Sequence, residues 1–461
     1  MSNAPAIDKL VITQREYFHT EETKPLEFRR RQLRMLEAAL YQHEDEILEA
    51  LRADLGKSAY EAYMTELGIV HTEINYMLKH MAKLAKPKRV RVAMGQLPGR
   101  AYPRMEPYGV VLILSPWNYP LLLTLMPLAA AMAAGNTVVL KPSDYSRHTS
   151  EVLAKIMQEI FPPEYITVLQ GGRAVNQSLL DQRFDYIFFT GGETVGKLVM
   201  RSAAEHLTPI TLELGGKSPC IVDETADIDL AAKRIVWGKL INAGQTCVAP
   251  DYLLVHRSIR DKLLQAMPRY IEAFYGSDTL HNELYPKIIS EKHFRRLTKL
   301  IDSASDTVIY GGRTDEALQK IEPTLLEPID WASPVMQEEI FGPILPILVY
   351  DDLDELIKTL AVKPKPLALY LFTESKAVEE RVLGGLSFGG GCINDTIMHL
   401  ASSHLPFGGV GDSGMGSYHG TESFKTFSHK KSILKKGRFL DIPLRYPPFK
   451  QDLRWLKRLM K

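Results

Sequence analysis

The residue of this chain most suited to chemistry is Cys247, a lone thiol in the short polar stretch from Asn242 to Pro250. Gly244 favours a loop there, and a thiol on a small polar loop is placed to react. Glu213 lies upstream, where the alternating segment 210–214 predicts a strand. A carboxyl group among apolar neighbours should have a raised pKa, which suits a general base near neutral pH. Together they suggest covalent catalysis through a thioester.

Both residues also have ordinary structural interpretations. A free cysteine is among the most frequently buried residue types, so Cys247 could be a core residue. Glu213 could be a strand residue in an ion pair with Lys217. Asn118, in the turn 115–120 that follows a predicted strand, could hold an oxyanion through its neutral amide. It could equally be a turn residue.

A second group of residues suggests a nucleotide site. The turn Thr190–Lys197 contains Gly191 and Gly192, follows a strand and opens a helix, a context in which backbone N–H groups bind phosphate. The alternative is a tight turn that needs small residues for packing. Lys141 and Asp144 end another strand, where such groups could hydrogen-bond ribose hydroxyls. A solvated loop is the alternative there.

Glu339 and Phe341 are two residues apart and would share a face of an extended segment. One could hold a ribose and the other could back a nicotinamide ring.

The pattern along the chain predicts an α/β fold with two sheets. Continuous apolar strands at 110–114, 137–140, 166–169 and 186–189 alternate with helices, which is typical of a doubly wound parallel sheet whose ligands lie at the carboxyl ends of the strands. A second α/β section begins near Leu212, with a helix at 230–241, a strand at 252–256 and a helix at 261–274. Helical patterns cover 24–51 and 60–83, and the basic segment near Lys86 to Glu106 predicts a projecting β-hairpin arm.

Composition limits the class of protein. With 461 residues, 24% charged and 45% hydrophobic, the chain should be a soluble globular protein of two or three domains. A net charge of +1 gives no case for a nucleic-acid partner. Three cysteines, and an N-terminus with no apolar signal region, predict a reducing, cytoplasmic location. No HExxH or CxxC spacing occurs, so we expect no metal site.

The tail from Lys450 to Lys461 carries five basic residues and one acidic residue. Leu453, Leu456 and Met460 would share one helical face, as expected of a basic amphipathic helix in weak contact with an anionic membrane surface. The alternative is that the tail packs on a subunit surface or frays.

Taken together, the motifs resemble the aldehyde dehydrogenase superfamily from about Phe28 to Pro448, in its class 3 or fatty-aldehyde branch. The stretches that carry the resemblance, in the family's order, are Pro116–Pro120, Lys141–Ser143, Phe189–Gly192, Leu212–Pro219, Gly244–Cys247, Glu338–Pro343 and Leu405–Gly411. The branch is indicated by Leu207–Pro209, Cys247–Tyr252, Ser413–Gly416 and Tyr418–Gly420.

This resemblance implies NAD(P)-dependent oxidation of an aldehyde, medium- to long-chain aliphatic or aromatic, to a carboxylic acid. Cys247 would attack the aldehyde, Asn118 and the Cys247 N–H would hold the oxyanion, and Glu213 would activate the water that hydrolyses the thioester. The positions that match cofactor contacts are Trp117, Lys141, Asp144, Gly191, Gly192, Glu339 and Phe341, and Tyr63 and Tyr119 are candidate pocket residues.

The family fold also implies a domain plan and a homodimer. The NAD(P)-binding domain would comprise 1–85 and 110–211, the catalytic domain 212–411, the oligomerisation element 86–109 and 412–446, and the tail 447–461.

Two departures concern the cofactor. Asp144 stands where the branch usually has Glu, and Gly192 where it usually has Ser. The shorter acid would leave room for a 2′-phosphate, so we expect some use of NADP beside NAD.

Three other functions compete with this interpretation. They are a thioester or ester hydrolase, a non-catalytic scaffold and a reductase acting in reverse. The nucleotide segments argue against the first, the presence of Cys247, Glu213 and Asn118 against the second, and Glu213 against the third.

Overall fold

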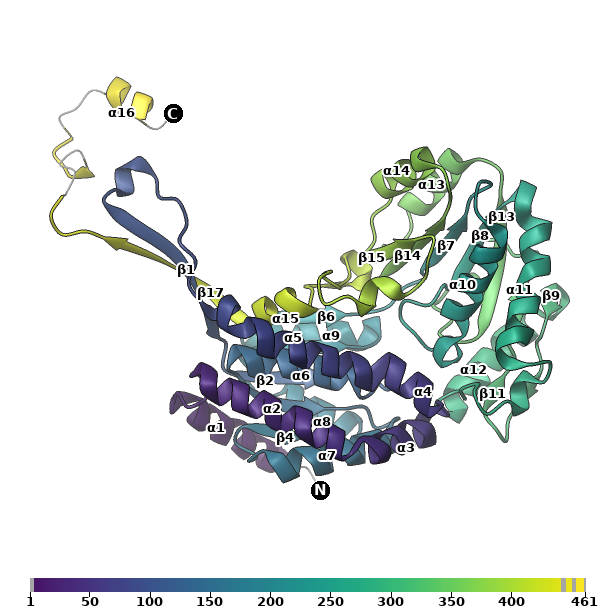
Figure 1. Cartoon of the computed structure of the whole chain (residues 1–461), viewed down its shortest axis with the longest axis horizontal. Coiled ribbons are helices and arrows are strands. Elements are labelled where there is room, and N and C mark those ends of the chain that lie inside the picture. The colour runs from purple at the N-terminus through teal and green to yellow at the C-terminus, as the bar shows by residue number, and fades with distance from the viewer. Residues whose placement is uncertain (1–3, 441–444, 450–452, 460–461) are drawn as a thin grey trace.

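Two large sheets form the body of the protein, and a long arm projects from it (Figure 1). The computed structural model describes residues 4–440, 445–449 and 453–459. The six-stranded sheet contains, in spatial order, β16 (Gly414–Met415), β6 (Ile210–Glu213), β5 (Tyr186–Thr190), β2 (Val110–Leu114), β3 (Thr137–Lys141) and β4 (Ile166–Val168). The seven-stranded sheet contains β15 (Gly390–Ile393), β14 (Ala368–Phe372), β7 (Pro219–Val222), β8 (Tyr252–His256), β13 (Ile344–Tyr350), β12 (Thr324–Leu326) and β9 (Val308–Tyr310).

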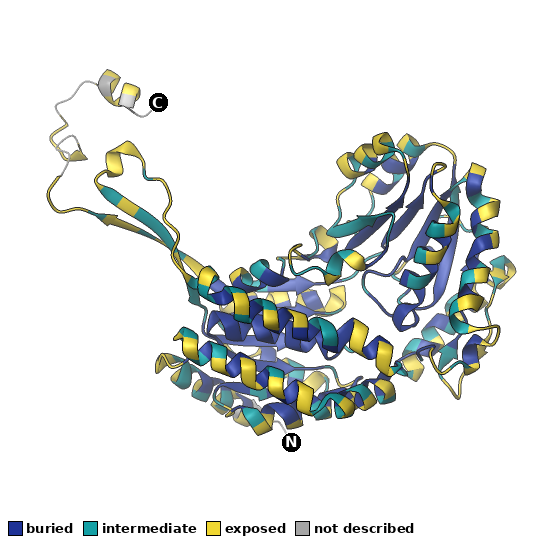
Figure 2. Cartoon of the chain, in the orientation of Figure 1, coloured by how far each residue is buried: buried dark blue, intermediate teal, exposed yellow. Residues whose placement is uncertain are grey.

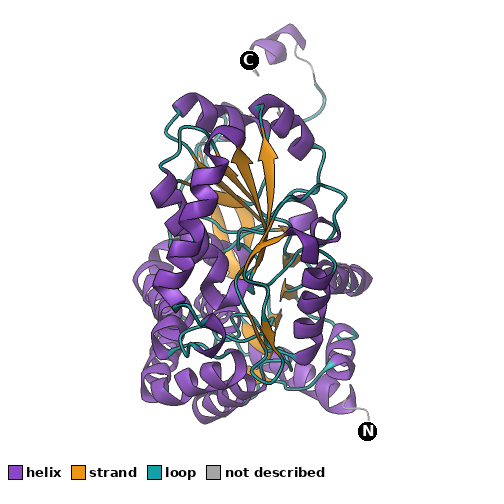
Figure 3. Cartoon of the chain, turned by 90° about the vertical axis from the view of Figure 1, so that its right-hand side faces the viewer, coloured by secondary structure: helices purple, strands orange, loops and turns teal. Residues whose placement is uncertain are grey.

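Helices cover both sheets, and Figure 3 shows them on either side of the strands. In chain order the α-helices of the described residues are α1 (Ala4–His19), α2 (Leu26–Gln42), α3 (Glu44–Leu55), α4 (Ala59–Ala62), α5 (Gly68–Ala85), α6 (Leu122–Ala134), α7 (Arg147–Ile160), α8 (Arg173–Leu180), α9 (Glu193–Glu205), α10 (Ile228–Leu240), α11 (Arg260–Tyr275), α12 (Glu291–Asp302), α13 (Leu353–Ala361), α14 (Lys376–Gly385), α15 (Gly420–Thr426) and α16 (Leu453–Leu459).

The six-stranded sheet is the doubly wound unit that the sequence predicts. Strands β2, β3 and β5 are buried along their whole length, and β2 pairs in parallel with both β3 and β5. Such strands have apolar residues on both faces of the sheet, so helices must cover both faces. Every residue of α6 is buried as well, and Gly135 ends this helix in the left-handed conformation, at φ 100°. The expected fold class is confirmed, and the residue boundaries of the domains stay predictions.

The arm differs from the expected hairpin. Its two strands are β1 (Gly99–Pro107) and β17 (Ser428–Lys436), which pair antiparallel although they are far apart in the chain. The segment before β1 contributes a single bridge, between Val90 and Ala101. The hairpin prediction is therefore wrong, since Pro87 has no N–H to donate to a ladder and β17 offers β1 a longer partner. Figure 2 shows the arm to be mostly exposed or half-buried.

The N-terminal helical region is more broken than its pattern predicts. The stretch 24–51 forms two helices separated at His43, and α1 was not expected at all. The stretch 60–83 contains a π-helical turn, η1 (Tyr63–Leu67), between α4 and α5. Such turns add a residue to the helical repeat and are frequent at functional sites.

The tail helix α16 lies beyond the arm (Figure 1). Its Leu453 and Leu456 are exposed, while residues 450–452 and 460–461 of the predicted amphipathic helix lie outside the described residues. Within the part of the chain that the structure describes, no helix has the length and apolar character needed to cross a membrane.

Candidate active site

Cys247 follows a loop with an unusual backbone. Asn242 and Ala243 have φ of 53° and 51°, in the left-handed region, and Gly244 follows at 74°. For residues other than glycine such a conformation costs on the order of 1–3 kcal/mol and persists only where neighbours fix it. At Gly244 a side chain is excluded, because a Cβ would lie 2.3 Å from the carbonyl oxygen of Gly342. The loop is thus strained immediately before the thiol.

Gln245 is one of the groups that fix this loop. Its buried side-chain amide donates to the carbonyl oxygens of Asn242 and Lys287, both at 3.0 Å, and its Oε1 accepts from the Ile289 N–H at 3.0 Å. These bonds connect the loop to a segment some forty positions later. The sequence analysis missed this role, although Gln245 lies within the motif that contains Cys247.

The thiol of Cys247 lines an apolar cavity of about 200 Å³. Burial raises the pKa of Cys247 to about 12, and the carboxyl groups of Glu339 and Glu213 add to the rise. The backbone N–H groups of Cys247 and Val248 act in the opposite direction, because they donate to the sulfur. The resting thiol is therefore protonated at neutral pH.

Glu213 ends β6 and is almost completely buried. Neither carboxylate oxygen has a hydrogen-bond partner among the described residues, and burial raises the pKa of Glu213 well above its usual range. Lys217 does not pair with it. The Lys217 ammonium instead pairs with Asp251 and donates to the backbone oxygens of Val335 and Glu338, at 2.9 and 2.8 Å. The ion-pair interpretation of Glu213 is wrong, and the carboxyl group is left unpartnered.

Asn118 lies beside the nucleophile loop, in the turn between β2 and α6. Its side-chain amide donates to the carbonyl oxygen of Gln245 at 3.1 Å, two residues before Cys247. The structure thus bonds the Asn118 amide to the loop that carries the thiol, which sequence spacing could not establish.

The walls of the cavity around Cys247 are mainly apolar. They include Met64, Tyr119, Met126, Trp237, Phe407 and Tyr418. Tyr119 therefore lies where a pocket residue was expected. Tyr63 does not line the cavity, because the π-helical turn presents Met64 and Thr65 to it instead.

A second and larger cavity, of about 640 Å³, is lined by residues from both sheets and their connections. Its lining includes Gly192, Gly215, Gly216 and Glu339. The Glu339 carboxylate packs on the glycine backbone, so closely that a Cβ on Gly215 would lie 2.3 Å from Glu339 Oε2. Burial raises the pKa of Glu339 to about 8, and Asp251 contributes to that rise.

Gly191 and Gly192 differ in what they offer a phosphate. Gly192 is exposed and begins α9, and no atom lies within 4 Å of the position a Cβ would take. The Gly191 N–H already donates to the Glu213 carbonyl oxygen at 3.0 Å. Gly192 and the first turn of α9 are thus open to an anion, whereas Gly191 connects β5 to the strand that carries Glu213.

The remaining predicted cofactor residues form two groups. Trp117 and Phe341 meet edge to face with ring centroids 5.3 Å apart, and His293 of α12 packs on Trp117. The buried ammonium of Lys141 donates to the carbonyl oxygen of Pro142 at 2.7 Å, and burial lowers its pKa. Asp144 is exposed nearby, against the Cα of Gly172. No group of metal-ligating side chains occurs within the described residues.

A doubly wound parallel sheet with a cavity at the N-terminus of α9, next to a second α/β unit, is the architecture of an oxidoreductase that binds a dinucleotide. The model of the aldehyde dehydrogenase family matches residues 1–433. The chain belongs to this family. It is an enzyme that oxidises aldehydes to carboxylic acids with a nicotinamide dinucleotide as cofactor.

Individual relatives agree over nearly the whole chain. A 4,4′-diaponeurosporen-aldehyde dehydrogenase of Staphylococcus aureus is 48% identical, with 99% of each chain covered. Human aldehyde dehydrogenase family 3 member B1 is 46% identical over 97% of this chain and 95% of its own. A substrate-bound structure of a Staphylococcus aureus enzyme superposes with a TM-score of 0.97, at 47% identity and 99% coverage of both chains. The resemblance to the class 3 branch is confirmed.

Proposed function

We propose that Cys247 is the nucleophile of this dehydrogenase. The observation that carries the proposal is the position of Cys247, which lines the apolar cavity two residues after Gln245, whose carbonyl oxygen accepts from the Asn118 amide. Cys247 attacks the aldehyde carbon as the thiolate, after its proton is released to solvent, and the resulting thiohemiacetal oxyanion is held by the Asn118 side chain and the Cys247 N–H. Loss of hydride from that carbon leaves a thioester on Cys247.

Glu213 is the general base of the second half-reaction. Its carboxyl group has no competing partner and its pKa is raised by burial, so it is a stronger base than an exposed carboxylate. It takes a proton from the water that attacks the thioester carbonyl. The carbon–sulfur bond then breaks, the acid leaves, and Cys247 is restored as a thiol.

The cofactor fits the larger cavity. Gly192 and the first turn of α9 line this cavity, where the N-terminus of a helix favours a pyrophosphate, and Glu339 is held on Gly215 and Gly216 to receive a ribose hydroxyl. Lys141 and Asp144 suit the adenosine ribose, and Trp117 and Phe341 the nicotinamide end. When bound, the nicotinamide ring supplies the hydride acceptor.

The substrate class follows from the apolar lining of the 200 Å³ cavity, which suits medium- to long-chain aliphatic or aromatic aldehydes. The test is reduction of NAD by the purified chain with aldehydes from acetaldehyde to decanal and benzaldehyde. We expect kcat/KM to rise with chain length, since about 0.8 kcal/mol is gained per buried methylene. A preference for acetaldehyde over every longer member would contradict the proposal.

The same assay, run with NADP, tests the role of Asp144. We expect measurable turnover with NADP, because the shorter acid leaves space for a 2′-phosphate. The matched variant Asp144→Glu should lower kcat/KM for NADP and leave that for NAD within about twofold. Negligible NADP turnover by the unaltered chain would contradict this interpretation.

The proposed assembly is a homodimer of a cytoplasmic enzyme. Support comes from the projecting arm and from four exposed apolar residues on and just after α9, which are Val195, Leu198, Met200 and Leu207. Light scattering should give about twice the chain mass of 52.0 kDa, and a monomer at micromolar concentration would contradict the dimer.

The three free cysteines suit a reducing compartment. Contact of α16 with an anionic membrane surface stays a prediction.

A further inference from the structure

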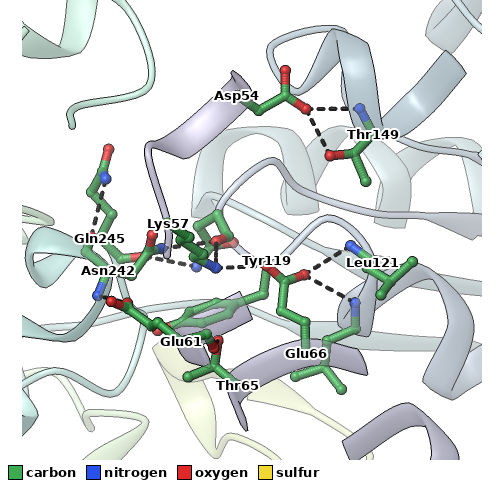
Figure 4. Close-up of polar contacts among 12 residues, drawn as sticks. Asp54, Lys57, Glu61, Thr65, Glu66, Tyr119, Leu121, Thr149, Asn242 and Gln245 are labelled. Carbon is green, nitrogen blue, oxygen red and sulfur yellow. Dashed lines mark hydrogen bonds and ion pairs between the residues drawn. The ribbon is translucent and has the colours of Figure 1, made fainter. Parts of the chain in front are cut away.

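A fully buried ion pair lies below the turn that carries Asn118. The Lys57 ammonium and Glu66 Oε1 are 2.6 Å apart, and neither side chain is exposed (Figure 4). Lys57 precedes α4, and Glu66 lies in the π-helical turn η1. Withdrawing two charges from water is so costly that such pairs seldom add net stability over apolar residues of similar size. The residues that the pair contacts indicate a role other than stability.

Lys57 contacts two neighbouring residues of the turn, Asn118 and Tyr119. Its ammonium donates to the backbone oxygen of Asn118 at 3.2 Å and lies 4.0 Å from the ring centroid of Tyr119. The Tyr119 hydroxyl in turn shares a hydrogen bond of 2.6 Å with Thr246 Oγ1, on the residue before Cys247. One ammonium group thus supports both the amide donor and, through Tyr119, the nucleophile loop.

Glu66 holds the other end of the same turn. Its second oxygen accepts from the N–H groups of Leu121 and Leu122, at 2.9 and 3.2 Å, where α6 begins (Figure 4). These N–H groups are among those that a helix leaves without internal partners. The ion pair therefore holds the turn at Asn118 and just beyond its carboxyl end, at the start of α6.

The nucleophile loop is bound into the same network. Glu61 Oε1 accepts from the Asn242 N–H at 2.7 Å, and the Asn242 side chain donates at 2.8 Å to the Asn118 backbone oxygen that Lys57 also contacts. Asn242 begins the left-handed segment before Cys247. The Asn118 carbonyl oxygen is consequently the point where the ion pair and the strained loop meet.

We propose that Lys57, paired with Glu66, is a positioning residue of the oxyanion site. It fixes the Asn118 backbone so that the side-chain amide and the Cys247 N–H converge on one oxygen atom. Lys57 lines neither the substrate cavity nor the cofactor cavity, so it acts through Asn118 and not on the substrate. This inference rests on the proposed role of Asn118.

The test removes the charges together. The double variant Lys57→Met/Glu66→Gln removes both charges of the pair, and the nearby buried Glu61, which Lys57 no longer holds in its charged form, can take up a proton. The double variant therefore remains able to fold where Lys57→Met alone could fail. We expect kcat to fall about 10- to 100-fold, less than the roughly 10²–10³-fold expected for loss of an oxyanion donor. Hydrolysis of p-nitrophenyl acetate by Cys247, which needs no cofactor, should fall by a similar factor, while KM for NAD stays within about twofold.

Asp54 offers a matched control within the same segment. It is buried and accepts from the Thr149 N–H at 2.8 Å and the Thr149 hydroxyl at 2.7 Å, away from Asn118 (Figure 4). Asp54→Asn should lower the melting temperature with kcat within about twofold, because it weakens a buried contact without moving the turn.

Combining the double variant with Asn118→Ala decides whether Lys57 acts through Asn118. We expect loss of the ion pair to cost less than about threefold in that background, since residues that act as a unit are not additive. The inference is overturned if the double variant keeps its kcat, or if its loss is as large without the Asn118 amide. Full activity of Asn118→Ala would contradict the oxyanion assignment itself. A slow Asn118→Ala beside a fully active double variant would overturn this inference alone.

Discussion

Cys247→Ala is expected to abolish NADH formation with every aldehyde, a loss of about 10⁴-fold or more in kcat. Without the thiol no thiohemiacetal forms, and hydride would have to leave a hydrated aldehyde. The fold should survive, because the side chain lines a cavity and its sulfur accepts only from backbone N–H groups of its own loop. Stopped-flow absorbance at 340 nm measures the loss, with NAD binding measured alongside.

Cys392→Ala is the matched control for this variant. Cys392 lies on β15, is half-buried and does not line the substrate cavity. Its removal should leave kcat within about twofold, as expected for a side chain outside the site. Residual turnover by Cys247→Ala above one thousandth of the unaltered rate would contradict the assignment of Cys247.

Glu213→Gln is expected to separate the two half-reactions. Its first turnover should release one NADH per active site, because attack by Cys247 and hydride loss do not need the base. Steady-state turnover should then fall about 10²–10⁴-fold, the usual contribution of a general base. Quenched-flow measurement of the burst and of the following linear phase gives both numbers.

The pH profile provides a second readout of the same variant. Because burial raises the pKa of Glu213 well above its usual range, the carboxyl group is protonated at acid pH and cannot accept a proton. Deacylation should accelerate as pH rises and Glu213 ionises, and Glu213→Gln should lose that limb. The competing carboxyl is Glu339, whose pKa is also raised and which also faces Cys247. A burst in Glu339→Gln and none in Glu213→Gln would show that the base is Glu339.

The strands whose residues form a continuous apolar run were predicted correctly from the sequence. Strands β2 and β8 have the predicted bounds, since a run of four or five consecutive apolar residues between turns leaves few alternatives. The arm could not be predicted in this way. The partner of β1 is β17, which lies more than three hundred residues later, and nothing in either segment alone specifies that pairing.

In the candidate site, the residue types could be predicted from the sequence, but the environment of each side chain could not. Cys247, Glu213 and Asn118 were identified from type and context, but not the empty hydrogen-bonding positions of Glu213 or the left-handed loop before Cys247. Lys57 and Glu66 were missed altogether. In the sequence Lys57 follows a helix stop and Glu66 lies in a helical pattern, so both resemble solvated charges. Only the π-helical turn and the packing of distant segments show that they are buried together.

The most direct test of covalent catalysis through Cys247 is the intact mass of Glu213→Gln quenched during turnover with NAD and hexanal. Most of the protein should gain the mass of one acyl group, and peptide mapping should place that group on Cys247. Its removal by hydroxylamine would identify a thioester. Unmodified protein together with a normal NADH burst, or an acyl group on another residue, would contradict covalent catalysis through Cys247.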